Sequence, residues 1–223
     1  MFVRRISTIA PLCALMLAAV PLLAQPQASG PRAELGPQAT EAHPDYGIVD
    51  GKHYVNGYFG FSYAFPDGWK ANAVQSSNAA ASQYALLTAN PDGSGGADMR
   101  YITIVADPLP KNTTPKTFMD AALKAFASPE AAFNVLHADK HYTFGSKQFY
   151  RLDLVSKAAP GAPVFYQTQM FVLMPGYAIT FSFMAANPND IETMVHGMES
   201  LSFRSVATPM RGTTEAKSQP QAR

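Results

Sequence analysis

The hydrophobic and polar positions of residues 58–69 alternate in a way that predicts a β-strand and a turn. Aromatic rings stand at every second position, with small residues between them: Phe59, Phe61, Tyr63 and Phe65. A period of two places these rings on one face of a strand and the small side chains on the other. A Pro-Asp-Gly turn signal follows at 66–68, before Trp69. We therefore expect a strand with a buried aromatic face that forms a hairpin with residues 69–74.

The same kind of alternation predicts three more hairpins. Their strands are expected at 83–88 with 100–106, at 135–144 with 148–156, and at 165–174 with 177–184. A Gly-rich segment separates the first pair and Gly145-Ser146-Lys147 the second. Pro175-Gly176, which suits the middle of a type II turn, separates the third. The order of the strands in a sheet does not follow from these patterns.

Two segments show helical spacing instead. Thr114 and Pro115 can begin a helix that ends before Pro129, and its apolar face is Phe118, Met119, Ala122, Leu123 and Phe126. Asn187 and Pro188 can begin another, with a stripe of Ile191, Met194, Val195, Met198 and Leu201. Gly197 costs a helix about 1 kcal/mol relative to Ala, so we expect a close backbone approach there. The fold class predicted is α+β: a mostly antiparallel sheet built from hairpins, with two main helices packed on it.

The N-terminus has the pattern of an export signal. Arg4 and Arg5 precede an apolar run, Ile9 to Leu23, which is too short for a comfortable membrane span. We predict a signal peptide over residues 1–24, cleaved after Ala24, with an uncleaved anchor as the alternative. A twin-arginine route and lipidation of Cys13 fit the flanking residues poorly.

Composition divides the remaining chain into three parts. Residues 25–50 are rich in Pro, Gln, Ala and Gly and are expected to form a disordered linker, and residues 205–223 a disordered tail. Residues 51–204 have the length and apolar content of a single α+β domain.

Charge and cysteine content exclude several classes of function. Removing residues 1–24 takes away two arginines and no acids, so 17 basic and 16 acidic residues become 15 and 16. No cluster of Lys or Arg suggests nucleic-acid binding or a polybasic membrane patch, and we expect no stable membrane insertion after signal cleavage. The single cysteine lies in the signal, which excludes disulfides, thiolate metal sites and cysteine nucleophiles from the mature chain.

The segment from Tyr54 to Trp69, together with a late helix that runs into Glu199-Ser200-Leu201-Ser202-Phe203, resembles the PsbP-like family. That family includes the extrinsic photosystem II protein and many exported bacterial proteins of unknown role. The resemblance implies an antiparallel sheet with helices packed on it over most of residues 54–204, and an accessory or binding role. Its motifs are structural, so they transfer a fold and no site.

The best candidate metal site is His137, Asp139 and His141, which would share one face of a strand. Residues two apart on a strand are separated by about 6.6 Å, too far to converge on one zinc ion with bonds near 2 Å. We interpret the three as an exposed polar strand face and predict no metal site.

Other patterns have structural interpretations. Ser62 loosely imitates the nucleophile elbow of serine hydrolases, but it lies inside an alternating strand. The Gly-rich segment 92–96 lacks the lysine and the helix of a phosphate loop. Trp69 is interpreted as a core anchor, and the late methionines as core residues: Met170, Met174, Met184, Met194 and Met198.

Two hypotheses for function follow. The first is an exported, periplasmic or extracellular, non-enzymatic accessory or binding protein, without cofactor or catalytic residues, that holds an unknown protein or small-molecule partner in the cell envelope. The alternative is a hydrolase or metal-dependent enzyme whose residues come from distant loops, such as His53, Asp107, His137 and Asp153. A His and a carboxylate within hydrogen-bond reach in a pocket would favour the enzyme, and an apolar surface patch the binding protein.

Overall fold

The computed structural model describes residues 43–74, 83–93 and 99–204. A four-stranded sheet has the order β1-β2-β3-β11, and its strands are β1 (Gly47–Asp50), β2 (His53–Asn56), β3 (Phe61–Ala64) and β11 (Ser202–Phe203). A seven-stranded sheet has the order β4-β5-β6-β10-β9-β8-β7, and its strands are β4 (Trp69–Ala73), β5 (Tyr84–Pro91), β6 (Tyr101–Pro108), β7 (Phe133–Phe144), β8 (Lys147–Ser156), β9 (Tyr166–Met174) and β10 (Tyr177–Ala185). All the strand pairs are antiparallel, so the predicted α+β class and the hairpins β5–β6, β7–β8 and β9–β10 are confirmed.

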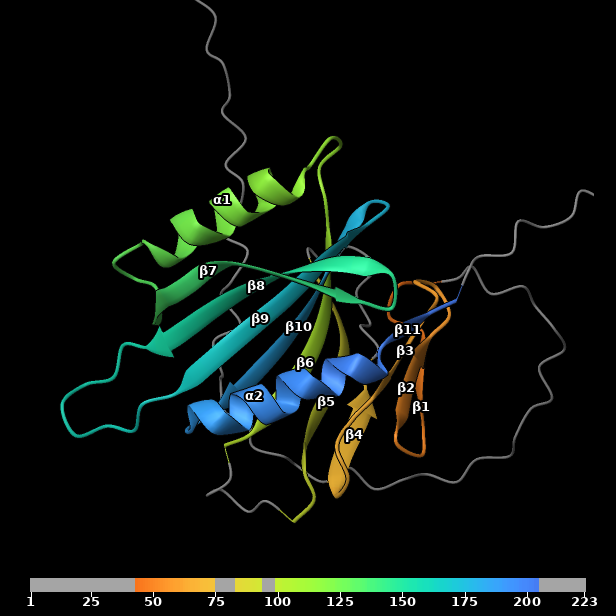
Figure 1. The fold of residues 1–223 in the computed structure, drawn as a ribbon, viewed down its shortest axis with the longest axis horizontal. Coiled ribbons are helices and arrows are strands. Elements are labelled where there is room, and N and C mark those ends of the chain that lie inside the picture. The colour runs from red at the N-terminus through yellow and green to blue at the C-terminus, as the bar shows by residue number, and fades with distance from the viewer. Residues whose placement is uncertain (1–42, 75–82, 94–98, 205–223) are drawn as a thin grey trace, which may run out of the picture.

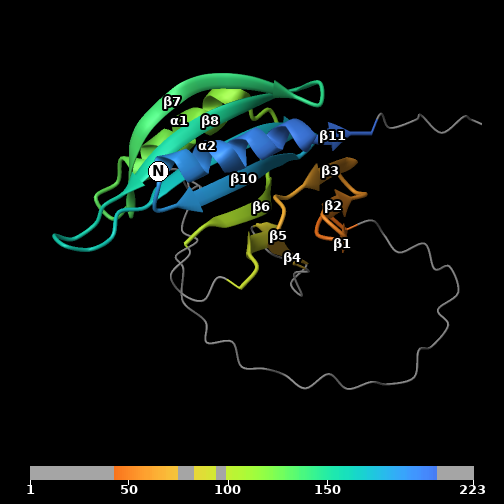
Figure 2. The same cartoon turned by 60° about the horizontal axis from the view of Figure 1, so that its bottom comes forward.

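The two main helices, α1 (Pro115–Phe126) and α2 (Pro188–His196), pack on opposite faces of the larger sheet (Figures 1 and 2). Successive side chains of β8 point to opposite faces of the sheet and so contact different helices. Leu152 and Leu154 pack with Ala122 and Phe126 of α1, whereas Phe149 belongs to the main core with the buried residues of α2. Side chains of both faces of β8 are therefore covered by a helix.

The aromatic strand predicted from residues 58–65 builds the contact between the two sheets. Its four alternating rings are buried, as predicted, and those of Phe61 and Tyr63 lie 5.8 and 5.6 Å from the ring of Phe181 on β10. The strand itself is shorter than expected, because β3 begins only at Phe61. The small sheet thus packs on the face of the large sheet that also carries α2.

The predicted hairpin between this strand and residues 69–74 is wrong. A turn is present, and Gly68 has the positive φ of 72° that favours glycine. Beyond the turn, however, the chain passes from one sheet to the other: β3 pairs with β2 and β11, whereas β4 pairs with β5. Because strands from elsewhere occupy both edges of β3, no edge remains for β4.

The folded part begins earlier than residue 51, where the sequence analysis places the start of the domain. Strand β1 covers Gly47–Asp50, and a Cβ atom on Gly47 would lie 2.1 Å from the Tyr54 hydroxyl of the neighbouring strand. Only a glycine admits this close packing. The predicted signal peptide, most of the predicted linker and the predicted tail lie outside the described residues.

Both helices begin where the caps predict. The Thr114 side chain accepts a hydrogen bond from the backbone N–H of Thr117, and the Asn187 side chain accepts one from that of Asn189. The whole stripe of the late helix is buried, and the α-helix passes into a short 3-10 helix, Gly197–Ser200. A Cβ on Gly197 would lie 3.5 Å from the Tyr63 hydroxyl, an ordinary contact, so the close approach expected there is not found. No helix within the described ranges has the length and apolar character to cross a membrane.

Candidate functional site

The four residues of the enzymatic alternative do not form one site. His53 is exposed on β2 of the small sheet, and Asp107 is buried near the end of β6. Asp107 pairs across the sheet with Ala178, which packs towards α1, whereas Asp153 pairs with Thr168 on the α2 face. The two carboxylates therefore face opposite sides of the sheet. Only His137 and Asp153 come together, with Nδ1 and Oδ2 4.0 Å apart.

Asp107 is nevertheless an unusual carboxyl group. Burial raises its pKa to about 6, and the hydrogen bond that Gln83 Nε2 donates to Oδ1 over 2.7 Å acts in the opposite direction. The sequence pattern does not predict this contact, because Gln83, just before β5, and Asp107, on β6, are 24 residues apart in the chain.

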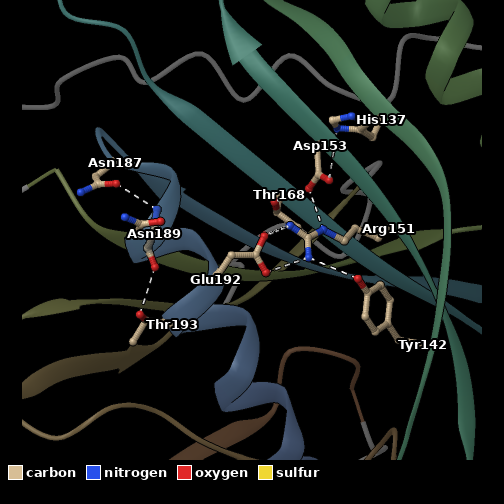
Figure 3. Close-up of polar contacts among 9 residues, drawn as sticks. All are labelled: His137, Tyr142, Arg151, Asp153, Thr168, Asn187, Asn189, Glu192 and Thr193. Carbon is tan, nitrogen blue, oxygen red and sulfur yellow. Dashed lines mark hydrogen bonds and ion pairs between the residues drawn. The ribbon is translucent and has the colours of Figure 1, made fainter.

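Asp153 belongs to a buried polar network centred on Arg151 (Figure 3). Arg151 Nε and the Thr168 hydroxyl both donate to Asp153 Oδ1, over 2.7 and 2.6 Å. The two terminal nitrogens of Arg151 donate to the two carboxylate oxygens of Glu192 on α2, one of them over 3.1 Å. The same guanidinium lies 5.9 Å from the centre of the Tyr142 ring. This network ties α2 to strands β8 and β9.

The charged groups of this network form ion pairs with one another. Burial alone would lower the pKa of Arg151, but the hydrogen bonds and charges of Glu192 and Asp153 outweigh it and raise that pKa above its ordinary value. His137 is beyond hydrogen-bond distance of Asp153, whose other oxygen already accepts two donors. The arrangement therefore fixes a helix on a sheet and does not form a free acid–base pair.

The histidines of the candidate metal site lie on opposite faces of β7. His137 pairs with Asp153 and His141 pairs with Tyr150, although the histidines are four positions apart along β7 and their partners only three positions apart along β8. An irregularity in β7 between His137 and Lys140 accommodates the extra residue, so that His141 lies on the opposite face of the strand from His137. The ring of His141 packs edge-on against Tyr150, 4.8 Å away. The prediction that His137 and His141 share one face is wrong, whereas the side chain of Asp139 lies outside the described part of the structure. The described side chains contain no group of three metal-binding residues.

The remaining candidates occupy structural positions. The Ser62 hydroxyl forms a hydrogen bond of 2.8 Å with the hydroxyl of Ser202 on the neighbouring strand. Trp69 is half-buried against the main core. Among the methionines, Met170, Met194 and Met198 are buried, and Met174 packs on the same core. Most of the Gly-rich segment 92–96 lies outside the described residues.

A connected series of aromatic rings crosses the end of the molecule where β5 and β10 begin. It is here called the ring run, and its members in spatial order are Tyr46, His43, Tyr84, Tyr177 and Tyr58. The successive centroid distances are 5.3, 5.3, 6.2 and 5.9 Å. Tyr46 and Tyr58, at the two ends, are 49% and 41% exposed. The run was not predicted, because its rings come from four separate stretches of the chain.

Polar contacts beneath the ring run hold its rings in place. The ring of His43 is hydrogen-bonded to the buried carboxylate of Asp45, and Asn56 donates to the carbonyl of Pro44 over 2.8 Å. A hydrogen bond with Tyr58, together with partial burial, raises the pKa of Tyr177 to about 12. Among the described residues, the rings that contact His43 are those of Tyr46 and Tyr84, so the hydrogen bond with Asp45 orients one ring of the run.

A cleft of about 430 Å³ lies at the same end of the larger sheet. It is lined by residues 109–113, which lead into α1, and by residues 173–176, at the end of β9 and in the β9–β10 turn. Met174 of the cleft pairs with Tyr177 of the ring run across that turn. Apolar residues such as Leu109 and Leu173 line it together with polar residues such as Lys111 and Asn112.

No known protein family profile matches the sequence, and no curated protein sequence matches it. The solved structures that resemble the fold include two cell-envelope or photosynthetic proteins. LpqN, involved in cell envelope biogenesis of Mycobacterium tuberculosis, aligns with a TM-score of 0.48 and 12% identity over 65% of this chain and 83% of its own. Cyanobacterial PsbP (CyanoP) from Synechocystis sp. PCC 6803 aligns with a TM-score of 0.47 and 15% identity over 71% of this chain and 99% of its own. The second is a PsbP protein, the family that the sequence pattern resembles; neither likeness assigns a function to this chain.

Proposed function

We propose that this protein is an exported, non-enzymatic accessory protein that binds a partner in the cell envelope through the ring run. The observation that carries the proposal is the exposure of Tyr46 and Tyr58 at the two ends of a series of ring contacts whose middle member, Tyr84, is anchored in the core. Tyrosine rings combine a large apolar area with a polar tip and lose little conformational freedom on binding, which suits them to recognition.

The arrangement of the ionisable side chains also favours a binding role over an enzymatic one. Arg151, Asp153 and Glu192 bind one another, and His43 is bound to Asp45. An acid–base function would need such a group placed beside a reactive hydroxyl, thiol or metal.

The proposal that the protein is exported rests on the sequence of residues 1–24. An intact-mass measurement of the secreted protein tests it: we expect a chain that begins at Gln25, whereas a mass that retains the signal would indicate an anchor.

The binding proposal is tested by site-specific photo-cross-linking in intact cells of the native host. A photoreactive phenylalanine analogue replaces Tyr46 in one variant and Tyr58 in another. Matched control variants carry it at Lys116 and Lys124, on the exposed side of α1. We expect positions 46 and 58 to give the same adduct and the α1 positions to lack it. The absence of an adduct from both tyrosines, or equal labelling from α1, would contradict the proposal.

A further inference from the structure

We propose that the outer edge of strand β1 pairs with β1 of a second copy of this protein. The two strands run antiparallel about a two-fold axis at Ile48, and the pairing joins the two small sheets into one continuous sheet. The inference goes beyond the binding of a partner by the ring run, because it rests on the backbone edge of a sheet and on the side chains of that edge.

The first observation is the position of β1 in the small sheet. It stands at one end of the order β1-β2-β3-β11, so no strand of the described ranges pairs with its outer edge (Figures 1 and 2). Strand β4 contacts β1 but belongs to the other sheet. In an antiparallel pair, the backbone groups of every second residue point away from the neighbouring strand. On an edge strand these N–H and C=O groups are the template for a further strand.

The second observation is that β1 lacks most of the features that discourage pairing at an edge. Natural edge strands are protected by shortness, bulges, prolines or charged side chains, lysine above all. Strand β11 has two residues, β7 has two irregularities of register, and β4 carries the exposed Lys70. Strand β1 pairs with β2 without a shift of register, has no proline or basic residue, and carries one charge, Asp50, at its end. Among the edges that the structure describes, β1 is the least protected.

The third observation is an exposed apolar side chain in the middle of this edge. Val49 packs against the main core, so its neighbour Ile48 points to the outer face of the small sheet. Ile48 is 64% exposed, whereas Leu136 on β7 is 47% and Val164 42% exposed. Val55, the partner of Ile48 on β2, lies half-buried beside it. A strand that places another apolar side chain opposite Ile48 would cover it.

The sequence of β1 is complementary to itself in one register. An antiparallel pair centred on Ile48 places the two isoleucines opposite each other, Gly47 opposite Val49, and Asp50 opposite Tyr46, just before the strand. No like charges face one another in this register. A pair centred on Asp50 would oppose two carboxylates, which is destabilising, and a pair centred on Val49 would oppose Ile48 to a carboxylate. A pair centred on Gly47 would extend into the turn that precedes the strand.

This register favours a second copy as the occupant of the edge. Two identical strands meet apolar against apolar, as an isologous contact about a two-fold axis requires. The chain that precedes β1 competes poorly, because Pro26, Pro31 and Pro37 have no N–H to donate to a strand ladder. Since only a few residues of each copy meet, we expect a weak and reversible dimer.

The first test is sedimentation velocity of the mature chain over a hundredfold range of concentration. We expect a monomer–dimer equilibrium whose dissociation constant rises at least tenfold in Ile48→Lys, because two lysines then face each other. An equimolar mixture of Ile48→Lys and Ile48→Glu should associate again, since opposite charges then meet. Leu136→Lys is the matched control, because it places the same charge at an exposed apolar position of another edge strand, and it should change the constant less than twofold. Thermal unfolding checks that the variants are folded.

The second test determines the register with single-cysteine variants, since the mature chain has no cysteine of its own. Ile48→Cys should form a disulfide-linked dimer under mild oxidation, because residues directly opposite have Cβ atoms about 4.5–5.5 Å apart. Asp50→Cys should not, because the two positions 50 lie four residues apart along the pair, about 13 Å at about 3.3 Å per residue.

Several outcomes would overturn the inference. They are a monomer at every concentration, association that Ile48→Lys retains or that Leu136→Lys abolishes, and cross-linking of Asp50→Cys in place of Ile48→Cys. A photoreactive residue at position 48 that captures a different protein in cells, while the purified chain stays monomeric, would assign the edge to a foreign strand. None of these outcomes decides the proposed function, because position 58 of the ring run lies outside the pairing.

Discussion

Replacing Arg151 by methionine should destabilise the protein more than any change at its exposed partner. The side chain of Arg151 is 5% exposed and that of Asp153 is 12% exposed, whereas Glu192 is 61% exposed. Methionine preserves much of the apolar stem of arginine but removes the guanidinium. The Asp153 carboxylate then keeps only the hydrogen bond from Thr168, while Glu192 turns to water.

The expected magnitudes follow from this difference in exposure. Removing one partner of a buried ion pair costs about 3–5 kcal/mol, because an uncompensated buried charge remains. An exposed ion-pair partner contributes about 0–1 kcal/mol. We therefore expect Arg151→Met to lower the free energy of unfolding by about 3–5 kcal/mol and Glu192→Gln by less than about 1 kcal/mol.

The assay is urea unfolding at pH 7, followed by the fluorescence of Trp69, the single tryptophan of the chain. Asp153→Asn completes a double-mutant cycle with Arg151→Met, and the double variant should be more stable than the sum of the single losses predicts. Losses of equal size from Arg151→Met and Glu192→Gln would refute the argument, since the cost would then not arise from the buried Asp153 charge. So would a loss below about 1 kcal/mol from Arg151→Met.

Three further predictions concern other parts of the fold. The raised pKa of Asp107, about 6, means that the folded state binds its proton more tightly than the unfolded chain, so this contribution to stability is present at low pH and is lost as the pH rises from about 4 to 6. Asp107→Asn should therefore be more stable than the wild type by about 2–3 kcal/mol at pH 7.5 and nearly equal to it at pH 4, and a pH-independent difference in thermal unfolding would contradict this. Met194→Ala or Leu201→Ala should cost about 2–5 kcal/mol in urea unfolding, because both side chains are buried in the main core; a loss below about 0.5 kcal/mol would place them on the surface. The double variant His137→Ala/His141→Ala should bind zinc and copper no differently from the wild type in calorimetric titration, since the two rings lie on opposite faces of β7, and loss of a tight one-to-one site would restore the metal hypothesis.

The sequence by itself determined the elements whose conformation depends on near neighbours. The β9–β10 hairpin follows from Pro175-Gly176, where Gly176 has the φ of 79° that the turn requires. The starts of α1 and α2 follow from Thr114 and Asn187, whose side chains bind backbone N–H groups two or three residues ahead. Alternation and helical spacing likewise identified the buried rings of residues 59–65 and the buried stripe of α2.

Tertiary structure decided which strands pair and therefore which side chains come together in the candidate sites. Strand β11, near the end of the described chain, takes one edge of β3, so the turn at Gly68 joins two sheets instead of two paired strands. His141 and His137 lie on opposite faces of β7 because the pairing with β8 leaves one extra residue in β7 between them. The ring run and the Arg151 network likewise join side chains from distant segments. A local pattern specifies the face of a strand but not its partner, because pairing is chosen by the burial of apolar surface over the whole fold.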